Sequence, residues 1–203
     1  EFEFGGSAGL TYGNYNCWRA GASITGPLSE TIAARLDGIW VQRDGFYQDT
    51  ANNTDVNDRD RYFVRAQLLF EPTEDVSFRL IGDYTYRDEK CCAATYVASS
   101  INQFIGNLNN PSTPLAPLQQ NGNNIINVLR DLGQNLAAFN QGYGRNISVT
   151  PGRSYAGETK DYGVSGELNW DFGGTRLTSI TGYRQYRSGQ ASDTDYGTVD
   201  ILY

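Results

Sequence analysis

Apolar and polar side chains alternate along the first twelve residues of the chain. Residues with apolar or small side chains take every second place: Phe2, Phe4, Gly6, Ala8, Leu10 and Tyr12. A period of two predicts a β-strand with one apolar and one polar face, because successive side chains of a strand point to opposite sides. The aromatic residues lie at the ends of this segment and the small or aliphatic ones lie between them. That distribution matches a lipid bilayer, whose interfaces favour aromatic rings.

Further segments along the chain have the same character. The alternation predicts strands over 18–25, 31–43, 61–70, 77–87 and 162–172, and a less regular strand over 176–186. In the last strand the apolar set is either Leu177 with Tyr183 or Ile180 with Tyr186. A soluble sandwich also alternates, but its core needs large interlocking side chains, whereas these apolar faces are rich in Ala and Gly. We therefore predict membrane-spanning strands in preference to a sandwich.

The connections between the predicted strands are alternately short and long. The segments 26–30, 71–75 and 171–175 contain Pro or Gly beside acidic residues, which favours compact turns, whereas 44–60 and 91–160 are long. Short turns at one rim and long loops at the other are typical of outer-membrane barrels. We expect an all-β fold: an antiparallel meander of about seven strands in chain order, forming part of a large transmembrane barrel with a long, partly helical extracellular loop at 91–160.

The two faces of the predicted sheet have different expected surroundings. Lipid should cover Ala34, Val64, Leu68, Phe78, Leu80 and Leu168. The opposite face carries charged residues in mid-strand, which suit the hydrated lumen of a pore. The candidate lumen-lining residues are Arg35, Asp37, Arg65, Arg79, Asp83 and Glu167.

Composition excludes several function classes. The formal net charge of −7 argues against nucleic-acid binding, which needs a basic face. The chain has no His and no nucleophile motif, so we expect neither an enzyme nor catalytic, metal-binding or cofactor-binding residues. No apolar run approaches the length of about 20 residues that a membrane helix needs. The absence of Met and of a signal peptide leads us to expect an internal piece of a longer protein.

Three cysteines make an odd count, so at least one thiol is free or paired outside the chain. Cys91 and Cys92 are adjacent, just after a predicted strand. We expect a disulfide from one of them to Cys17 or to a cysteine outside the chain, rather than a metal site, which would need more ligands.

The segment 91–160 is too long for a passive turn. Apolar residues at helical spacing, Ile126, Leu129, Leu132 and Leu136, predict a helix over 123–141, and a shorter helix is expected over 101–108. Two roles stay open for this loop: a surface shield, or a ligand-contacting element. In the second case the candidate contacts are Phe139, Asn140, Gln141 and Tyr143.

An ordered series of segments resembles TonB-dependent outer-membrane receptors, especially those of sphingomonads and related Gram-negative bacteria. The segments are YGNY at 12–15, GPLSETIAARL at 26–36, RDGF at 43–46, DRYFVRAQLLFEPT at 60–73, DY at 83–84, CC at 91–92 and LTSITGYR at 177–184. The resemblance implies the first seven strands of a barrel of about 22 strands, without the plug domain that contacts TonB.

The resemblance also implies a function in the outer membrane of a Gram-negative bacterium. Such receptors take up ferric siderophores, haem, cobalamin or glycans, with energy delivered through TonB. Its expected partners are outer-membrane lipid, the TonB complex through the plug, and a small ligand such as a siderophore. The alternative is a passive porin or a soluble structural or adhesive β-protein.

Overall fold

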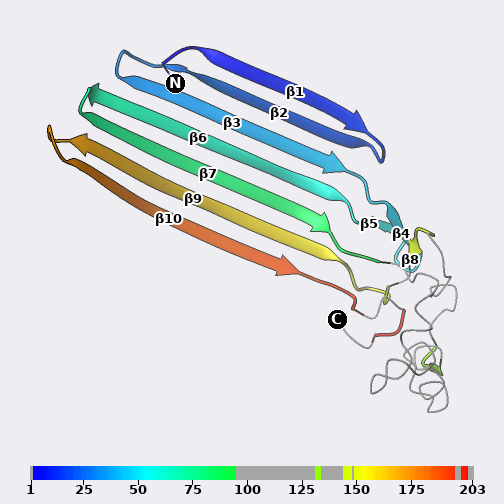
Figure 1. The fold of residues 1–203 in the computed structure, drawn as a ribbon. Coiled ribbons are helices and arrows are strands. Elements are labelled where there is room, and N and C mark those ends of the chain that lie inside the picture. The colour runs from blue at the N-terminus through cyan, green and yellow to red at the C-terminus, as the bar shows by residue number, and fades with distance from the viewer. Residues whose placement is uncertain (1, 95–130, 134–143, 148, 195–197, 201–203) are drawn as a thin grey trace, which may run out of the picture. The chain divides into compact units, whose positions relative to one another are not determined.

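The computed structural model describes residues 2–94, 131–133, 144–147, 149–194 and 198–200. Figure 1 shows its ten strands, most of them long and antiparallel. In chain order they are β1 (Gly5–Gly13), β2 (Cys17–Pro27), β3 (Ile32–Arg43), β4 (Tyr47–Asp49), β5 (Thr54–Val56), β6 (Arg59–Thr73), β7 (Val76–Lys90), β8 (Asn146–Ile147), β9 (Ala156–Asp171) and β10 (Arg176–Gln190).

The chain forms two compact units. The first consists of residues 1–44, 58–89 and 157–190, and the second of 45–57, 90–156 and 191–203. The predicted insert 91–160 therefore contributes mostly to the second unit. The segment 45–57, predicted only as a long loop, also belongs to that unit.

The first unit is one antiparallel sheet of seven strands in the order β1-β2-β3-β6-β7-β9-β10 (Figure 1). All seven predicted strands are present, and each pairs with its neighbour in the chain among the strands of this sheet, so the predicted meander is confirmed. The sheet is open, with β1 and β10 at its edges. The turns after β2, β6 and β9 lie at its short-turn end, and the connections after β1, β3 and β7 lie at the other, which we call the long-loop end.

The register assigns every strand residue to one of two faces. Ala8, Ala22, Gly38, Val64 and Tyr84 lie directly opposite one another across five strands and define the apolar face. The residues one place along the chain define the polar face. In β10, Leu177 pairs with Trp170 and Tyr183 with Val164, so the first of the two predicted apolar sets belongs to the apolar face.

The apolar face of this unit is exposed rather than packed into a core. Val64, Leu68, Phe78 and Leu80 are 37–42% exposed, and Leu168 and Ala34 share their face at intermediate exposure. Within the described part of the first unit, the buried apolar residues are Ala33 and Leu69, which lie opposite each other on the polar face. This arrangement is the reverse of a soluble sandwich, in which the apolar face would be buried.

The second unit has a small core of its own. A hairpin of β4 and β5 pairs in parallel with β8 through Gln48↔Asn146. Val56, Ile147, Val149 and Tyr155 pack together with Ala93, each at most 6% exposed, and Tyr47 packs against them. Gly45 is required here, because a Cβ on it would lie 2.6 Å from backbone atoms of Val56.

Most of the helix predicted over 123–141, and all of that over 101–108, lies outside the described residues. Of the longer one, Asp131 is helical and a turn follows it to Gly133. Across the described residues, the structure contains no helix with the length and apolar character needed to cross a membrane.

Candidate functional site

Aromatic side chains form a belt on the apolar face at the long-loop end. The ring of Tyr62 lies 5.8 Å from that of Tyr84 and 5.5 Å from that of Tyr86, measured between centroids, and Tyr84 lies 6.3 Å from Tyr162. At the far side of the sheet, Tyr12 and Trp18 are 4.6 Å apart. These contacts form two groups, one of rings from β6, β7 and β9 and the other of rings from β1 and β2. The strand register therefore brings together rings that no single strand contains.

A second group of aromatic residues lies at the short-turn end of the same face. Phe70 and Phe78 are directly opposite in β6 and β7, and the rings of Trp170 and Phe172 are 4.4 Å apart. Small and aliphatic residues such as Ile24, Leu36 and Ala66 occupy the rows between the two belts. Aromatic ends around an aliphatic middle are the composition of a lipid-facing strand surface.

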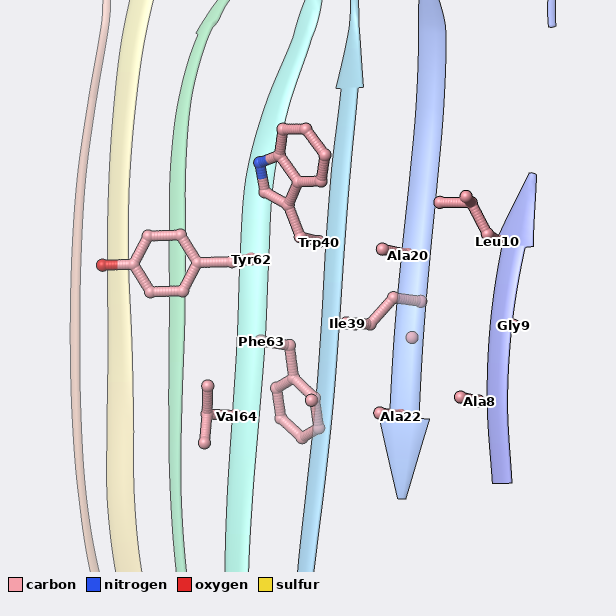
Figure 2. Close-up of a pocket in the computed structure, with 12 residues that line it drawn as sticks. Ala8, Gly9, Leu10, Ala20, Ala22, Ile39, Trp40, Tyr62, Phe63 and Val64 are labelled. Carbon is pink, nitrogen blue, oxygen red and sulfur yellow. The ribbon is translucent and has the colours of Figure 1, made fainter. Parts of the chain in front are cut away.

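The middle of the apolar face contains a shallow hollow of about 650 Å³ (Figure 2). Its floor is low because Ala8, Ala20, Ala22 and Gly38 have little or no side chain. Leu10, Trp40, Tyr62 and Val64 stand around it. The hollow has no charged lining residue, so it suits hydrocarbon rather than a polar substrate.

The polar face carries ion pairs at two separate places in the middle of the sheet. Arg35 binds the carboxylate of Asp37 through Nε and Nη2, with distances from 2.9 to 3.1 Å. On the other side of the sheet, Arg184 in β10 donates to Asp83 at 2.8 Å and to Asp161 at 2.9–3.1 Å. The Asp83 side chain is only 9% exposed, whereas Arg184 is 54% exposed. Arg35, Asp37 and Asp83 are among the candidate lumen-lining residues, and the structure pairs Arg35 with Asp37. Arg184 and Asp161 were not among the predicted residues.

The remaining predicted lumen residues share this face but are not all joined in one network. Arg65 lies in register between Asp37 and Asp83, and its guanidinium is 5.6 Å from the centre of the Phe63 ring. Arg79 lies opposite Leu69. Glu167 accepts a hydrogen bond from Asn169 at 2.8 Å.

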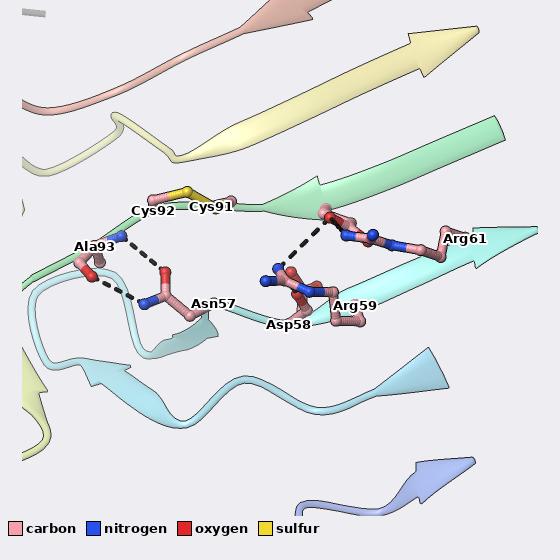
Figure 3. Close-up of polar contacts among 8 residues, drawn as sticks. Asn57, Asp58, Arg59, Arg61, Cys91, Cys92 and Ala93 are labelled. Atoms are coloured by element: carbon pink, nitrogen blue, oxygen red, sulfur yellow. Dashed lines mark hydrogen bonds and ion pairs between the residues drawn. A yellow bond between two sulfur atoms is a disulfide. The ribbon is translucent and has the colours of Figure 1, made fainter. Parts of the chain in front are cut away.

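A second cluster of charged residues lies at the long-loop end of the polar face. Arg61 donates two hydrogen bonds, of 2.6 and 2.7 Å, to the two oxygens of the Glu89 carboxylate. Arg59 adds an ion pair to Glu89 at 3.6 Å and donates to the Asp58 carbonyl oxygen at 2.9 Å. Figure 3 shows both arginines on the same strand, reaching toward the end of β7. Glu89 is almost buried beneath them, with 9% of its side chain exposed.

In the second unit, Asn57 fixes the chain just after the two cysteines. Its amide nitrogen donates to the Ala93 carbonyl oxygen at 2.8 Å, and its amide oxygen accepts from the Ala93 backbone N–H at 2.7 Å (Figure 3). The Asn57 backbone N–H also donates to Lys90, and Cys91 N–H donates to Tyr155. The disulfide joins Cys91 to Cys92, and Cys17 is free, so the predicted pairing with Cys17 or with an outside cysteine is wrong. The two neighbouring cysteines pair with each other, an alternative that was not among the predicted pairings.

The candidate ligand contacts Phe139, Asn140, Gln141 and Tyr143 lie outside the described residues, so the loop hypothesis stays a prediction. Comparison with known proteins finds no matching family model, and a search of curated proteins finds no significant match.

Proposed function

We propose that the chain is a wall segment of an outer-membrane β-barrel that works as a receptor for TonB-energised uptake of a scarce nutrient. The observation that carries the barrel proposal is the exposed apolar face with an aromatic belt at each end and an aliphatic middle. A water-soluble protein would leave a large apolar patch in water, which favours aggregation. Lipid removes that penalty, and the charged polar face then lines a hydrated lumen.

The two sheet edges support closure by further strands. Among the described residues, β1 and β10 each pair on one side only, so each presents a row of backbone N–H and C=O groups that no described strand pairs with. Because each unsatisfied group costs several kcal/mol in lipid, a membrane-embedded sheet has to close into a barrel. The uptake role and its dependence on TonB rest on the sequence resemblance. Candidate nutrients are ferric siderophores or similar chelates, cobalamin and glycans.

Adjacent residues of β7 offer a matched test of the barrel. Leu80 is on the apolar face and Ile81 on the polar face. In the full-length protein, Leu80→Arg should weaken insertion into lipid vesicles by about 2–4 kcal/mol if Leu80 lies near the midplane, whereas Ile81→Arg should leave it intact. Heat-modifiable gel migration reports the folded barrel. Equal behaviour of the two variants would contradict the lipid-facing assignment.

Transport needs a separate test in cells. Uptake of labelled nutrients should disappear in a strain that lacks TonB, although the barrel still reaches the outer membrane in that strain. Uptake that persists without TonB would favour the alternative of a passive porin. A protein recovered in the aqueous fraction would favour a soluble structural or adhesive role.

A further inference from the structure

Five arginines gather at the long-loop end of the polar face. Arg19, Val41, Arg61 and Arg87 form one row across β2, β3, β6 and β7, and Arg43 and Arg59 are paired one row further out. We call Arg19, Arg43, Arg59, Arg61 and Arg87 the arginine band. This concentration is unexpected in a chain whose formal net charge is −7. Alternation assigns these residues to the polar face, but only the register reveals that they lie in two neighbouring rows.

Acidic residues are segregated from the band. Glu89 is its main carboxylate, and both Arg59 and Arg61 bind it. Asp60 and Asp88 occupy the positions next to Arg61 and Arg87, so their side chains point to the opposite face. Asp161 is engaged by Arg184. The band therefore keeps an excess of positive charge on one side of the sheet.

The geometry around Glu89 shows how the band holds an anion. Arg61 binds both carboxylate oxygens in parallel, which is the strong fork geometry that guanidinium favours with carboxylate and phosphate. Arg19 and Arg87 lie on the same row at its two sides, three strand spacings apart, or about 14 Å between backbones. Neither has an ion pair with a described residue. Arginine side chains spread over this distance on one face suit a ligand with several anionic groups.

We propose that the arginine band binds polyanionic ligands, meaning molecules that carry several carboxylate or phosphate groups. The inference rests on the proposed function, because it takes the polar face as the lumen of a pore and the long-loop end as its outer mouth. Within that function it narrows the nutrient to an anionic chelate or phosphorylated compound, rather than a neutral glycan.

Cys17 provides a native probe inside the band. Its thiol is free, and it lies on the polar face one row beyond Arg19 in β2. In the full-length protein in micelles, with any cysteine outside 1–203 replaced by serine, the reaction rates of Cys17 with sulfonatoethyl and trimethylammonioethyl methanethiosulfonate are compared. The rate for the anionic reagent is divided by the rate for the cationic one, and this ratio is divided by the same ratio for mercaptoethanol. The result reports the electrostatic potential at Cys17 and does not depend on how much thiolate Cys17 forms.

The ratio should favour the anionic reagent by about tenfold or more at low ionic strength and should fall as salt is added. Arg19→Gln with Arg87→Gln should lower it at least about threefold, and lysine at both positions should restore it. Arg35→Gln with Arg79→Gln removes the same charge from the same face at the other end of the sheet and serves as the matched control. An unbiased ratio, or an equal loss in the control, would overturn the proposal.

Binding itself is tested with inorganic pyrophosphate. Pyrophosphate should slow labelling of Cys17 by uncharged methyl methanethiosulfonate in a saturable way, at constant ionic strength, and the double glutamine variant should lose this protection. Absence of protection in a protein that shows heat-modifiable barrel migration overturns the polyanion site alone. A protein that never forms the barrel overturns the proposed function and this inference together.

Discussion

The two units of the chain solve the problem of apolar surface in opposite ways. The sheet leaves large apolar side chains such as Leu36 and Val64 exposed, and its mid-strand charges face the other side. The second unit buries Val56 and Tyr155 almost completely and places Asp49 and Asp193 beneath its surface, each 1% exposed. One region needs an external apolar solvent, and the other supplies its own core. A single average hydropathy therefore describes neither of them.

The largest effect should follow from emptying the core of the second unit. Tyr155→Ala removes a buried ring and the hydrogen bond from its hydroxyl to the Asp193 carbonyl oxygen, and should destabilise this unit by about 3–5 kcal/mol. Hydrogen exchange in the full-length protein should show faster exchange at Ile147 and Cys91 but not in β6. Tyr155→Phe keeps the ring and should cost far less. Simultaneous loss of protection in β6 would mean that the units are one cooperative structure.

Loss of the Asn57 side chain should have an effect of similar size. Asn57→Ala leaves the buried Ala93 N–H and C=O without their amide partner, at about 1–3 kcal/mol for each group. Asn57 also has a positive φ of 64°, which alanine tolerates less well. Asn57→Gly relieves this backbone strain but does not restore the hydrogen bonds. The difference in stability between the two variants therefore isolates the contribution of the backbone. The rate of protease cleavage after Ala93 would measure the loss of stability in each variant. An unchanged rate in both variants would contradict a stabilising role for the Asn57 hydrogen bonds to Ala93.

The same substitution in both units tests the comparison directly. Val56→Leu overpacks a closed core and should cost about 1–3 kcal/mol. Val64→Leu adds the same methylene to the exposed apolar face, where lipid rearranges, and should be close to neutral. Thermal unfolding in lipid, monitored by hydrogen exchange in each unit, measures the loss of stability at the two sites separately. A comparable loss at both sites would show that the apolar face is packed against protein.

The smallest effect should come from the surface ion pair of Arg35. Its side chain is 45% exposed, so Arg35→Gln should change stability by less than about 1 kcal/mol. Denaturation midpoints in low and high salt provide the measurement. A large effect at both salt concentrations would contradict the assignment of this face to water.

Sequence patterns predicted the sheet well because its faces are chemically distinct. Ala22, Gly38 and Val64 alternate with Ser23, Asp37 and Arg65, so β2, β3 and β6 each encode their own orientation. The strands β4, β5 and β8 were missed because two or three residues cannot display a period. Their position depends instead on Gly45 and on Asn57, whose role appears only when Ala93 is placed beside it.

The site was predicted less completely, for the same physical reason. Arg35 and Asp37 are two residues apart on one strand, so their pairing is visible in the sequence. Arg184 and Asp83 are separated by 101 residues and meet only through the order of β7, β9 and β10. The alternative apolar sets of β10 left the face of Arg184 undecided.

The unequal lengths of the strands have a consequence for recognition. β9 has 16 residues, whereas β1 has nine. At about 3.3 Å per residue and a tilt of about 40°, β9 would rise roughly 40 Å, well beyond an apolar band about 25 Å tall. In the proposed barrel, this part of the rim would stand above the membrane as a stiff collar. β6 and β7, with 15 residues each, are almost as long and carry Arg59, Arg61 and Arg87. If these arginines bind a ligand as proposed, their backbone would be held in place before the ligand arrives. Little backbone entropy would then be lost on binding, and selectivity would need no moving lid.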